Sequence, residues 1–130
     1  MLRESVWEKR DFFTDQCLLI DDFAFSLDDI EHGILRWNGP RKKEKPDQFL
    51  AGDERLKLMV QTMDYRVHFA LNCGSLSCPP IAYYSQGKID EQLRLAEESF
   101  SAVEFVINQE GKGIDCSSIF LWYRSDFGNH

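Results

Sequence analysis

The sequence of 130 residues predicts a single α+β domain, with about four helices packed on a small, mainly antiparallel sheet. Apolar residues recur at helical spacing in some segments and alternate with polar residues in others. These two kinds of segment follow each other without the strand–helix–strand rhythm of a parallel sheet. Hydrophobic residues make up 43% of the chain and charged residues 28%, a balance typical of folded globular domains.

The N-terminal third predicts extended pieces followed by a helix. Residues 11–25 are rich in aromatic and aliphatic side chains, and the two aspartates at 21–22 indicate a turn between short strands. Ser26 and Asp29 have the spacing of a capping box, in which each side chain accepts a hydrogen bond from the other residue's backbone N–H. The helix that they begin is expected to end near Asn38, before a Gly-Pro pair.

The rest of the chain predicts three more helices, a strand and a hairpin. Asp53 is the expected N-cap of a helix whose core-facing residues are Leu56, Met59, Val60 and Met63. Residues 66–72 alternate strictly and predict a strand. A third helix is expected to pack through Ile89, Leu93, Ala96 and Phe100. Residues 103–107 and 114–116 predict a hairpin, and residues 117–123 a short closing helix.

Charge and cysteine usage narrow the function classes. A surface that binds the phosphate backbone of a nucleic acid is positively charged. The net charge of −7 and the pI near 4.9 argue against such a surface, so no nucleic-acid partner is expected. The basic cluster at 41–45 is interpreted as a solvated loop. No apolar run is long enough to span a bilayer, and residues 1–10 lack a signal-peptide core, so we expect a cytoplasmic protein without disulfides. Cys17 and Cys116 are expected to be small core residues.

A polar cluster is predicted on the first helix. At 100° per residue, Glu31 falls inside the apolar stripe, and His32 falls on its flank beside Arg36. A carboxylate in that position needs a partner. The alternatives are that Glu31 reaches solvent or caps a backbone amide, and that His32 makes a surface contact with Asp28.

The predicted strand supplies possible partners for Glu31. Arg66, His68 and Asn72 share one strand face, so Arg66 could neutralise Glu31 and the carboxylate could orient His68 as a base. The alternative is that this face is the solvated side of an antiparallel sheet.

The segment 71–80, Leu-Asn-Cys-Gly-Ser-Leu-Ser-Cys-Pro-Pro, is the most distinctive of the chain. Cys78 or Ser77 could be a nucleophile, with His68 or His32 as the base. Glu31 or Asn72 could orient that base, and backbone amides near Gly74 could stabilise an oxyanion. The candidate catalytic residues are therefore Glu31, His32, Arg36, His68, Asn72, Ser77 and Cys78. Pro79 opposes this interpretation, because it keeps Cys78 off a helix N-terminus. A zinc site from Cys73, Cys78, His68 and His32 is disfavoured by the strand phase of Cys73, so neither metal nor cofactor is expected.

The same segments resemble the domain of unknown function 547 (DUF547) family. The resemblance rests on Ser26 to Arg36, on Arg66 to Pro80 and on Ile119 to Phe127, and it extends from about Phe12 to Phe127. It implies that Glu31, His32, Arg36, His68, Ser77 and Cys78 occupy the signature positions of the family. Because members usually begin with a further helix, residues 1–130 are expected to be one N-terminally truncated domain.

Two functions remain open at this stage. The first is a hydrolase or transferase with a polar pocket where the Glu31 helix meets the His68 strand and the Ser77-Cys78 loop. The second is a non-catalytic protein-interaction module, in which the same residues form a buried polar network. The partner is an unidentified protein or small molecule in either case.

Overall fold

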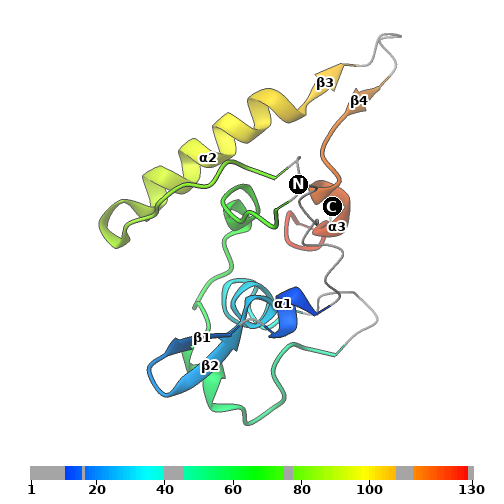
Figure 1. The fold of residues 1–130 in the computed structure, drawn as a ribbon. Coiled ribbons are helices and arrows are strands. Elements are labelled where there is room, and N and C mark those ends of the chain that lie inside the picture. Colours follow the sequence, from blue (N-terminus) through cyan, green and yellow to red (C-terminus); the bar gives the residue numbers. More distant parts are fainter. Residues whose placement is uncertain (1–10, 16, 40–45, 75–77, 108–112, 129–130) are drawn as a thin grey trace, which may run out of the picture. The chain divides into compact units, whose positions relative to one another are not determined.

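A computed structural model describes residues 11–15, 17–39, 46–74, 78–107 and 113–128 (Figure 1). The chain divides into two compact units, Met1–Asp64 (unit 1) and Tyr65–His130 (unit 2). The described part of each unit combines helices with a two-stranded antiparallel sheet, which confirms the α+β class.

The described part of unit 1 begins with a short helix and a hairpin. α1 (Phe12–Asp15) is helical, so the expectation of extended chain from residue 11 was wrong there. β1 (Cys17–Ile20) pairs with β2 (Phe23–Ser26), and Ile20 lies opposite Phe23. Asp21 takes a φ of 51°, in the left-handed region that aspartate tolerates, so the predicted turn is confirmed. All of β1 is exposed; the expectation that Cys17 is a core residue was therefore wrong.

The helix after the hairpin starts as predicted and then takes a wider form. The Ser26 N–H donates to Oδ2 of Asp29 at 2.9 Å, and the Asp29 N–H donates to Oγ of Ser26 at 3.0 Å, which completes the capping box. From there η2 (Asp29–Leu35) is a π-helix, and Arg36 N–H donates to the carbonyl of Glu31, five residues back, at 2.9 Å.

The second predicted helix is much shorter than expected. Asp53 is its N-cap, and its carboxylate accepts a hydrogen bond from the Arg55 N–H, but the 3₁₀-helix η3 ends after five residues (Glu54–Leu58). Met59 is extended, and the Val60 N–H donates to the carbonyl of Ile34 at 3.2 Å. The predicted helical stripe from Leu56 to Met63 is therefore wrong, because the chain becomes extended at Met59 and the Val60 N–H bonds to η2 instead of continuing a helix.

Two phenylalanines form the core of unit 1. The exposed fractions of Phe25 and Phe49 are 0% and 2%, and their rings meet edge to face with centroids 6.4 Å apart. Phe49 also lies against Gly33, where a Cβ atom would come within 2.2 Å of its ring. Asn38, itself at a φ of 57°, holds the backbone of Phe49 by donating to its carbonyl at 3.1 Å and accepting from its N–H at 2.7 Å.

Unit 2 is built on the predicted third helix, α2 (Ile89–Glu104), which the 3₁₀ turn η5 (Gln86–Lys88) precedes. The predicted strand 66–72 was wrong, because the 3₁₀-helix η4 (Tyr65–Phe69) takes its place. His68 and Phe69 are both buried although they are consecutive, and a strand would send them to opposite faces. Phe69 packs on Phe100 of α2 with centroids 5.1 Å apart, and such aromatic contacts outweigh a modest strand propensity.

The C-terminal hairpin and closing helix lie near their predicted places, but the start of the hairpin was wrong, because Val103 and Glu104 still belong to α2. β3 (Val106–Ile107) pairs antiparallel with β4 (Ile114–Asp115), and α3 (Ile119–Trp122) is the short aromatic helix. Phe120 of α3 joins the cluster of Phe69, Phe100 and Phe127. Cys116 is exposed, so the expectation of a core role for it was also wrong.

Candidate functional site

The π-helix of unit 1 buries His32 and Arg36 rather than Glu31. His32 is 3% exposed and Arg36 7%, whereas the Glu31 side chain is 23% exposed. Nη1 of Arg36 lies 2.7 Å from Nδ1 of His32. A guanidinium only donates hydrogen bonds, so Nδ1 accepts and the ring carries its proton on Nε2, which lies 3.9 Å from Oε1 of Glu31.

The prediction that His32 lies on the flank was wrong, whereas Glu31 is half-buried, and the helix type explains the error. The 100° step applies to 3.6 residues per turn, but i→i−5 hydrogen bonding places more residues in each turn. The angular positions therefore drift from those of an α-helix, and the drift brings His32 into the interior. Asp28, the expected surface partner of His32, is itself buried.

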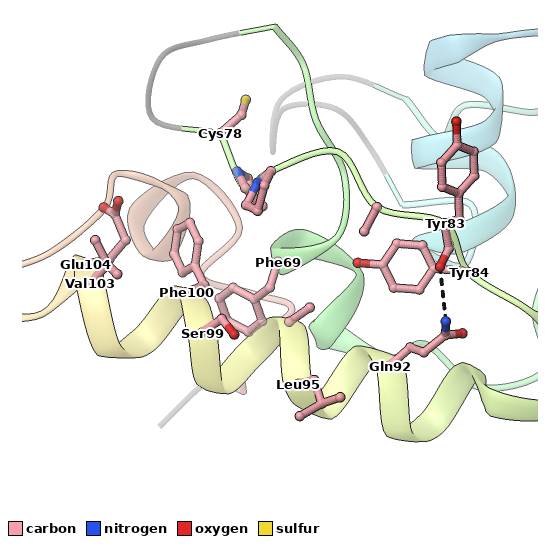
Figure 2. Close-up of a pocket in the computed structure, with 14 residues that line it drawn as sticks. Phe69, Cys78, Tyr83, Tyr84, Gln92, Leu95, Ser99, Phe100, Val103 and Glu104 are labelled. Atoms are coloured by element: carbon pink, nitrogen blue, oxygen red, sulfur yellow. Dashed lines mark hydrogen bonds between the residues drawn. The ribbon is translucent and has the colours of Figure 1, made fainter.

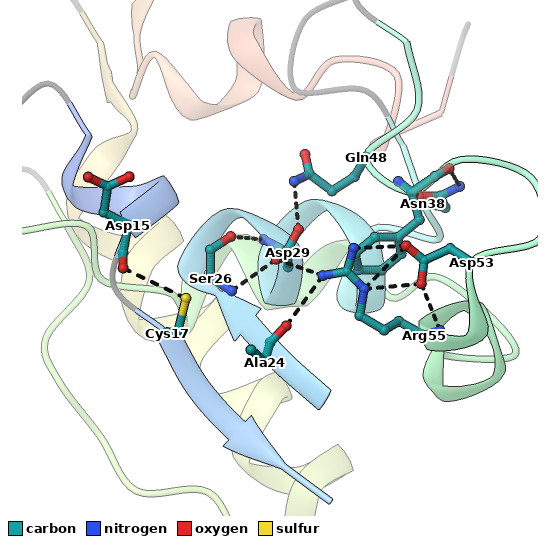
Figure 3. A network of polar contacts seen from close by, with 10 residues as sticks. Asp15, Cys17, Ala24, Ser26, Asp29, Asn38, Gln48, Asp53 and Arg55 are labelled. Carbon is teal, nitrogen blue, oxygen red and sulfur yellow. Dashed lines mark hydrogen bonds and ion pairs between the residues drawn. The ribbon is translucent and has the colours of Figure 1, made fainter. Parts of the chain in front are cut away.

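A second polar network in unit 1 centres on Asp29 and Arg55 (Figure 3). Arg55 donates to Asp29 at 3.1 Å and to Asp53 at 2.8 Å, and its guanidinium lies 4.3 Å from the centre of the Phe49 ring. Gln48 donates to the other oxygen of Asp29 at 2.8 Å. Burial raises the pKa of Asp29, but the hydrogen bonds from Gln48 and Ser26 and the charge of Arg55 outweigh burial, so the pKa is lowered overall.

In unit 2, His68 pairs with an acid near the end of the chain. Its Nε2 donates to Oδ2 of Asp126 at 2.9 Å, and its ring stacks on Tyr123 with centroids 3.9 Å apart. The His68 side chain is 2% exposed and that of Asp126 12%. Asp126 therefore fixes the Nε2 side of the His68 ring within unit 2. Arg66 pairs with Asp90 of α2 at 2.7 Å.

The cysteine loop of unit 2 is tied together by its own groups. Asn72 donates to the carbonyl of Pro79 at 2.6 Å and accepts from the Gly74 N–H at 2.8 Å. The sulfur atoms of Cys73 and Cys78 lie 2.9 Å apart. No hydrogen bond joins Cys78 to His68 within the described residues. Ser77 lies outside the described residues.

A groove of about 600 Å³ lies between α2 and the segment 78–84 (Figure 2). Apolar and aromatic side chains dominate its lining: Phe69, Pro79, Pro80, Leu95, Phe100 and Val103. Cys78 also contributes to the wall, but its sulfur points away from α2 in Figure 2. The surface that the groove offers to a ligand is therefore mainly hydrophobic.

A few polar groups interrupt this lining. Gln92 accepts from the Ser85 N–H at 2.8 Å and donates to the Tyr83 carbonyl at 3.0 Å, which fastens the extended wall to α2. Burial raises the pKa of Tyr84, so its phenol remains a hydrogen-bond donor. Glu104, the last residue of α2, lies half-buried in the lining, and no cation pairs with it among the residues that the structure describes.

The model of the family described as "Protein of unknown function, DUF547" matches residues 1–100. The chain belongs to the DUF547 family. The match includes all of unit 1 and the first part of unit 2, and it confirms the family predicted from the sequence motifs. No curated protein and no solved structure matches the DUF547 chain.

The predicted site residues of the DUF547 chain fall into two groups. Glu31, His32 and Arg36 belong to unit 1, and His68, Asn72 and Cys78 belong to unit 2. Within unit 1 the structure brings His32 and Arg36 together. Within unit 2, the Asn72 side chain hydrogen-bonds to the backbone of its own loop, and the His68 ring hydrogen-bonds to Asp126.

Sequence reasoning missed several partners. Asp126 belongs to the third segment of the family resemblance, but it lies 58 residues from His68, and nothing in the sequence pairs the two. Glu104 and Tyr84 carried no motif. The described residues contain no group of three or more His, Cys, Asp or Glu that could hold a metal ion. None of the helices in the described ranges is long and apolar enough to cross a membrane.

Proposed function

We propose that the DUF547 chain is a non-catalytic binding module, and that the groove of unit 2 takes a small, elongated apolar ligand with one positively charged end. The observation that carries the proposal is the apolar lining of the groove, which includes the carboxylate of Glu104. Among the residues that the structure describes, no positively charged side chain pairs with this carboxylate. The volume of about 600 Å³ falls in the range of small-molecule sites, which combine an apolar lining with few polar groups.

The position of Glu104 supports a cationic ligand end. A carboxylate in the last turn of a helix opposes the partial negative charge of the helix C-terminus, at a cost of about 0.3–1 kcal/mol. A bound ammonium group would relieve this repulsion and would gain an ion pair in a partly desolvated place. The apolar body of the ligand would cover Phe100 and Leu95.

The buried polar pairs support the binding role over the catalytic one. His68 is 2% exposed at its side chain and hydrogen-bonded to Asp126, so a substrate has little access to the ring. His32 is equally buried against Arg36. These pairs are suited to stabilising the fold of each unit, because buried polar groups with satisfied hydrogen bonds make a structure more rigid.

A hydrolase or transferase with Cys78 as nucleophile stays a prediction. The His68–Asp126 pair resembles a base with its orienting acid, which favours this alternative. An alkylation rate of Cys78 that falls when His68 is replaced by alanine would support the enzyme; an unchanged rate would count against it.

The test is calorimetric titration of the protein with octylamine and with 1-octanol at neutral pH. Octylamine is expected to bind more tightly than octanol, because only the amine carries a charge. Glu104→Gln should weaken the binding of octylamine about threefold to fivefold, which corresponds to a partly exposed ion pair, and should leave octanol unchanged.

Ala96→Phe supplies the matched control for the groove itself. Ala96 is a groove-lining residue on α2, and a phenyl ring there would fill the space and abolish the binding of both probes. Circular dichroism would show that the helix is retained. Equal affinity of the parent protein for amine and octanol, or binding that survives Ala96→Phe, would refute the proposal.

A further inference from the structure

Two cysteines of unit 2 approach each other closely across five residues of sequence. The Sγ atoms of Cys73 and Cys78 lie 2.9 Å apart, and the Cys73 N–H donates to Sγ of Cys78 at 3.2 Å. Both residues are half-buried, and no disulfide joins them. A disulfide bond needs sulfur atoms at about 2.05 Å, so only a small movement separates this pair from a covalent link.

The surrounding backbone keeps the two sulfur atoms together. Asn72 precedes Cys73 and donates to the carbonyl of Pro79, which follows Cys78, at 2.6 Å. The same side chain accepts from the Gly74 N–H at 2.8 Å, and Gly74 takes a φ of 81° that favours glycine. One amide side chain therefore clamps the residues next to both cysteines, so the proximity of the thiols does not depend on their own contact.

We propose that Cys73 and Cys78 are a reversible dithiol–disulfide pair, which a low-molecular-weight disulfide such as glutathione disulfide oxidises. One protein thiolate attacks the glutathione disulfide, forms a mixed disulfide and releases one glutathione thiolate. The second protein thiolate then attacks the protein sulfur of the mixed disulfide and releases the second glutathione. The protein loses two protons and two electrons, and one glutathione disulfide is reduced to two glutathione molecules.

The two remaining cysteines give the contrast that makes this proposal testable. Cys17 and Cys116 are exposed, and they belong to different units. An exposed thiol without a neighbouring thiol stops at the mixed disulfide, whereas a paired thiol goes on to the internal disulfide. The Cys17→Ser/Cys116→Ser variant therefore isolates the pair.

The experiment is intact-mass spectrometry of that double variant after incubation with glutathione disulfide. The expected product has lost two hydrogen atoms, carries no glutathione, and returns to its original mass with dithiothreitol. Tandem mass spectrometry of a digest should locate the bond between Cys73 and Cys78. Adding Cys78→Ser should trap one glutathione on Cys73, because the resolving thiol is then absent.

Two outcomes would overturn the inference. Stable glutathione adducts on both Cys73 and Cys78 of the double variant would show that the thiols react independently. An unchanged mass, under conditions in which the exposed Cys17 of the parent protein is modified, would show that the pair is closed to exchange.

Discussion

Gly33 shows at the scale of one residue how closely unit 1 is packed. A Cβ atom at this position would lie 2.2 Å from Cε2 and 2.3 Å from Cζ of Phe49, far inside van der Waals contact. Phe49 is 2% exposed and is held by Asn38, so its ring has little room to move. Glycine is required here by the close approach of a ring rather than by its backbone freedom.

We predict that Gly33→Ala lowers the free energy of unfolding by about 1–3 kcal/mol, the usual cost of overpacking a core. Equilibrium denaturation with urea is the measurement. Gly87→Ala is the matched control, because nothing lies within 4 Å of a Cβ atom at Gly87. If the two alanine variants unfold at the same urea concentration, the packing of Phe49 on η2 is looser than described.

Single residues also mark what sequence alone can predict. The Ser26–Asp29 capping box and the N-cap at Asp53 were predicted correctly, because their partners lie within three residues. The buried state of His32 was not predictable from a wheel that assumes α-helical geometry. The His68–Asp126 pair was not predictable because only the tertiary fold brings together residues 58 positions apart.

At the scale of elements, the long amphipathic helix was predictable and the short ones were not. α2 follows from its apolar stripe, and the β1–β2 hairpin from its apolar residues and its turn. η3 and η4 have only five residues each, and contacts with other parts of their unit decide their form. Local propensity is weak over such lengths, so the predicted strand at 66–72 was a reasonable interpretation that the packing of Phe69 overrides.

Asp29 joins three elements of unit 1, and its ionisation should contribute to their stability. It begins η2, caps against Ser26 of β2, and binds Arg55 of η3. Burial opposes its charged form, yet hydrogen bonds from Gln48 and Ser26 and the charge of Arg55 lower its pKa overall. A lowered pKa contributes stability that is present above the unfolded value, near 3.9, and is lost as the pH falls through the folded value.

We therefore predict that the parent protein loses stability below about pH 4 more steeply than Asp29→Asn. The asparagine variant should be less stable at neutral pH, and the two curves should converge in acid. Urea denaturation at a series of pH values is the measurement. Parallel curves over the whole acid range would show that the Asp29 network does not depend on the charge of Asp29.

At the scale of the whole molecule, exposed apolar side chains coexist with a net charge of −7. Leu19, Ile81 and Tyr83 have exposed fractions of 81%, 81% and 94%. Repulsion between like-charged molecules opposes contact between such side chains, and it vanishes at the isoelectric point.

We predict that self-association is strongest near pH 4.9 and reverses on return to neutral pH. Static light scattering between about pH 4 and pH 8 is the measurement, and low ionic strength should strengthen the effect because charge is then less screened. Scattering that is strongest at pH 8 would show that the apolar surface dominates regardless of charge.

The contact of Asn38 with Phe49 has a consequence for protein engineering. One side chain holds both the N–H and the carbonyl of a core residue eleven positions later, so the two ends of the intervening stretch are fixed by Asn38 itself. Because the entropy of closing a loop rises only slowly with its length, an inserted tag between residues 39 and 48 should leave Phe49 in place. Gly33, by contrast, leaves no room for a single methyl group.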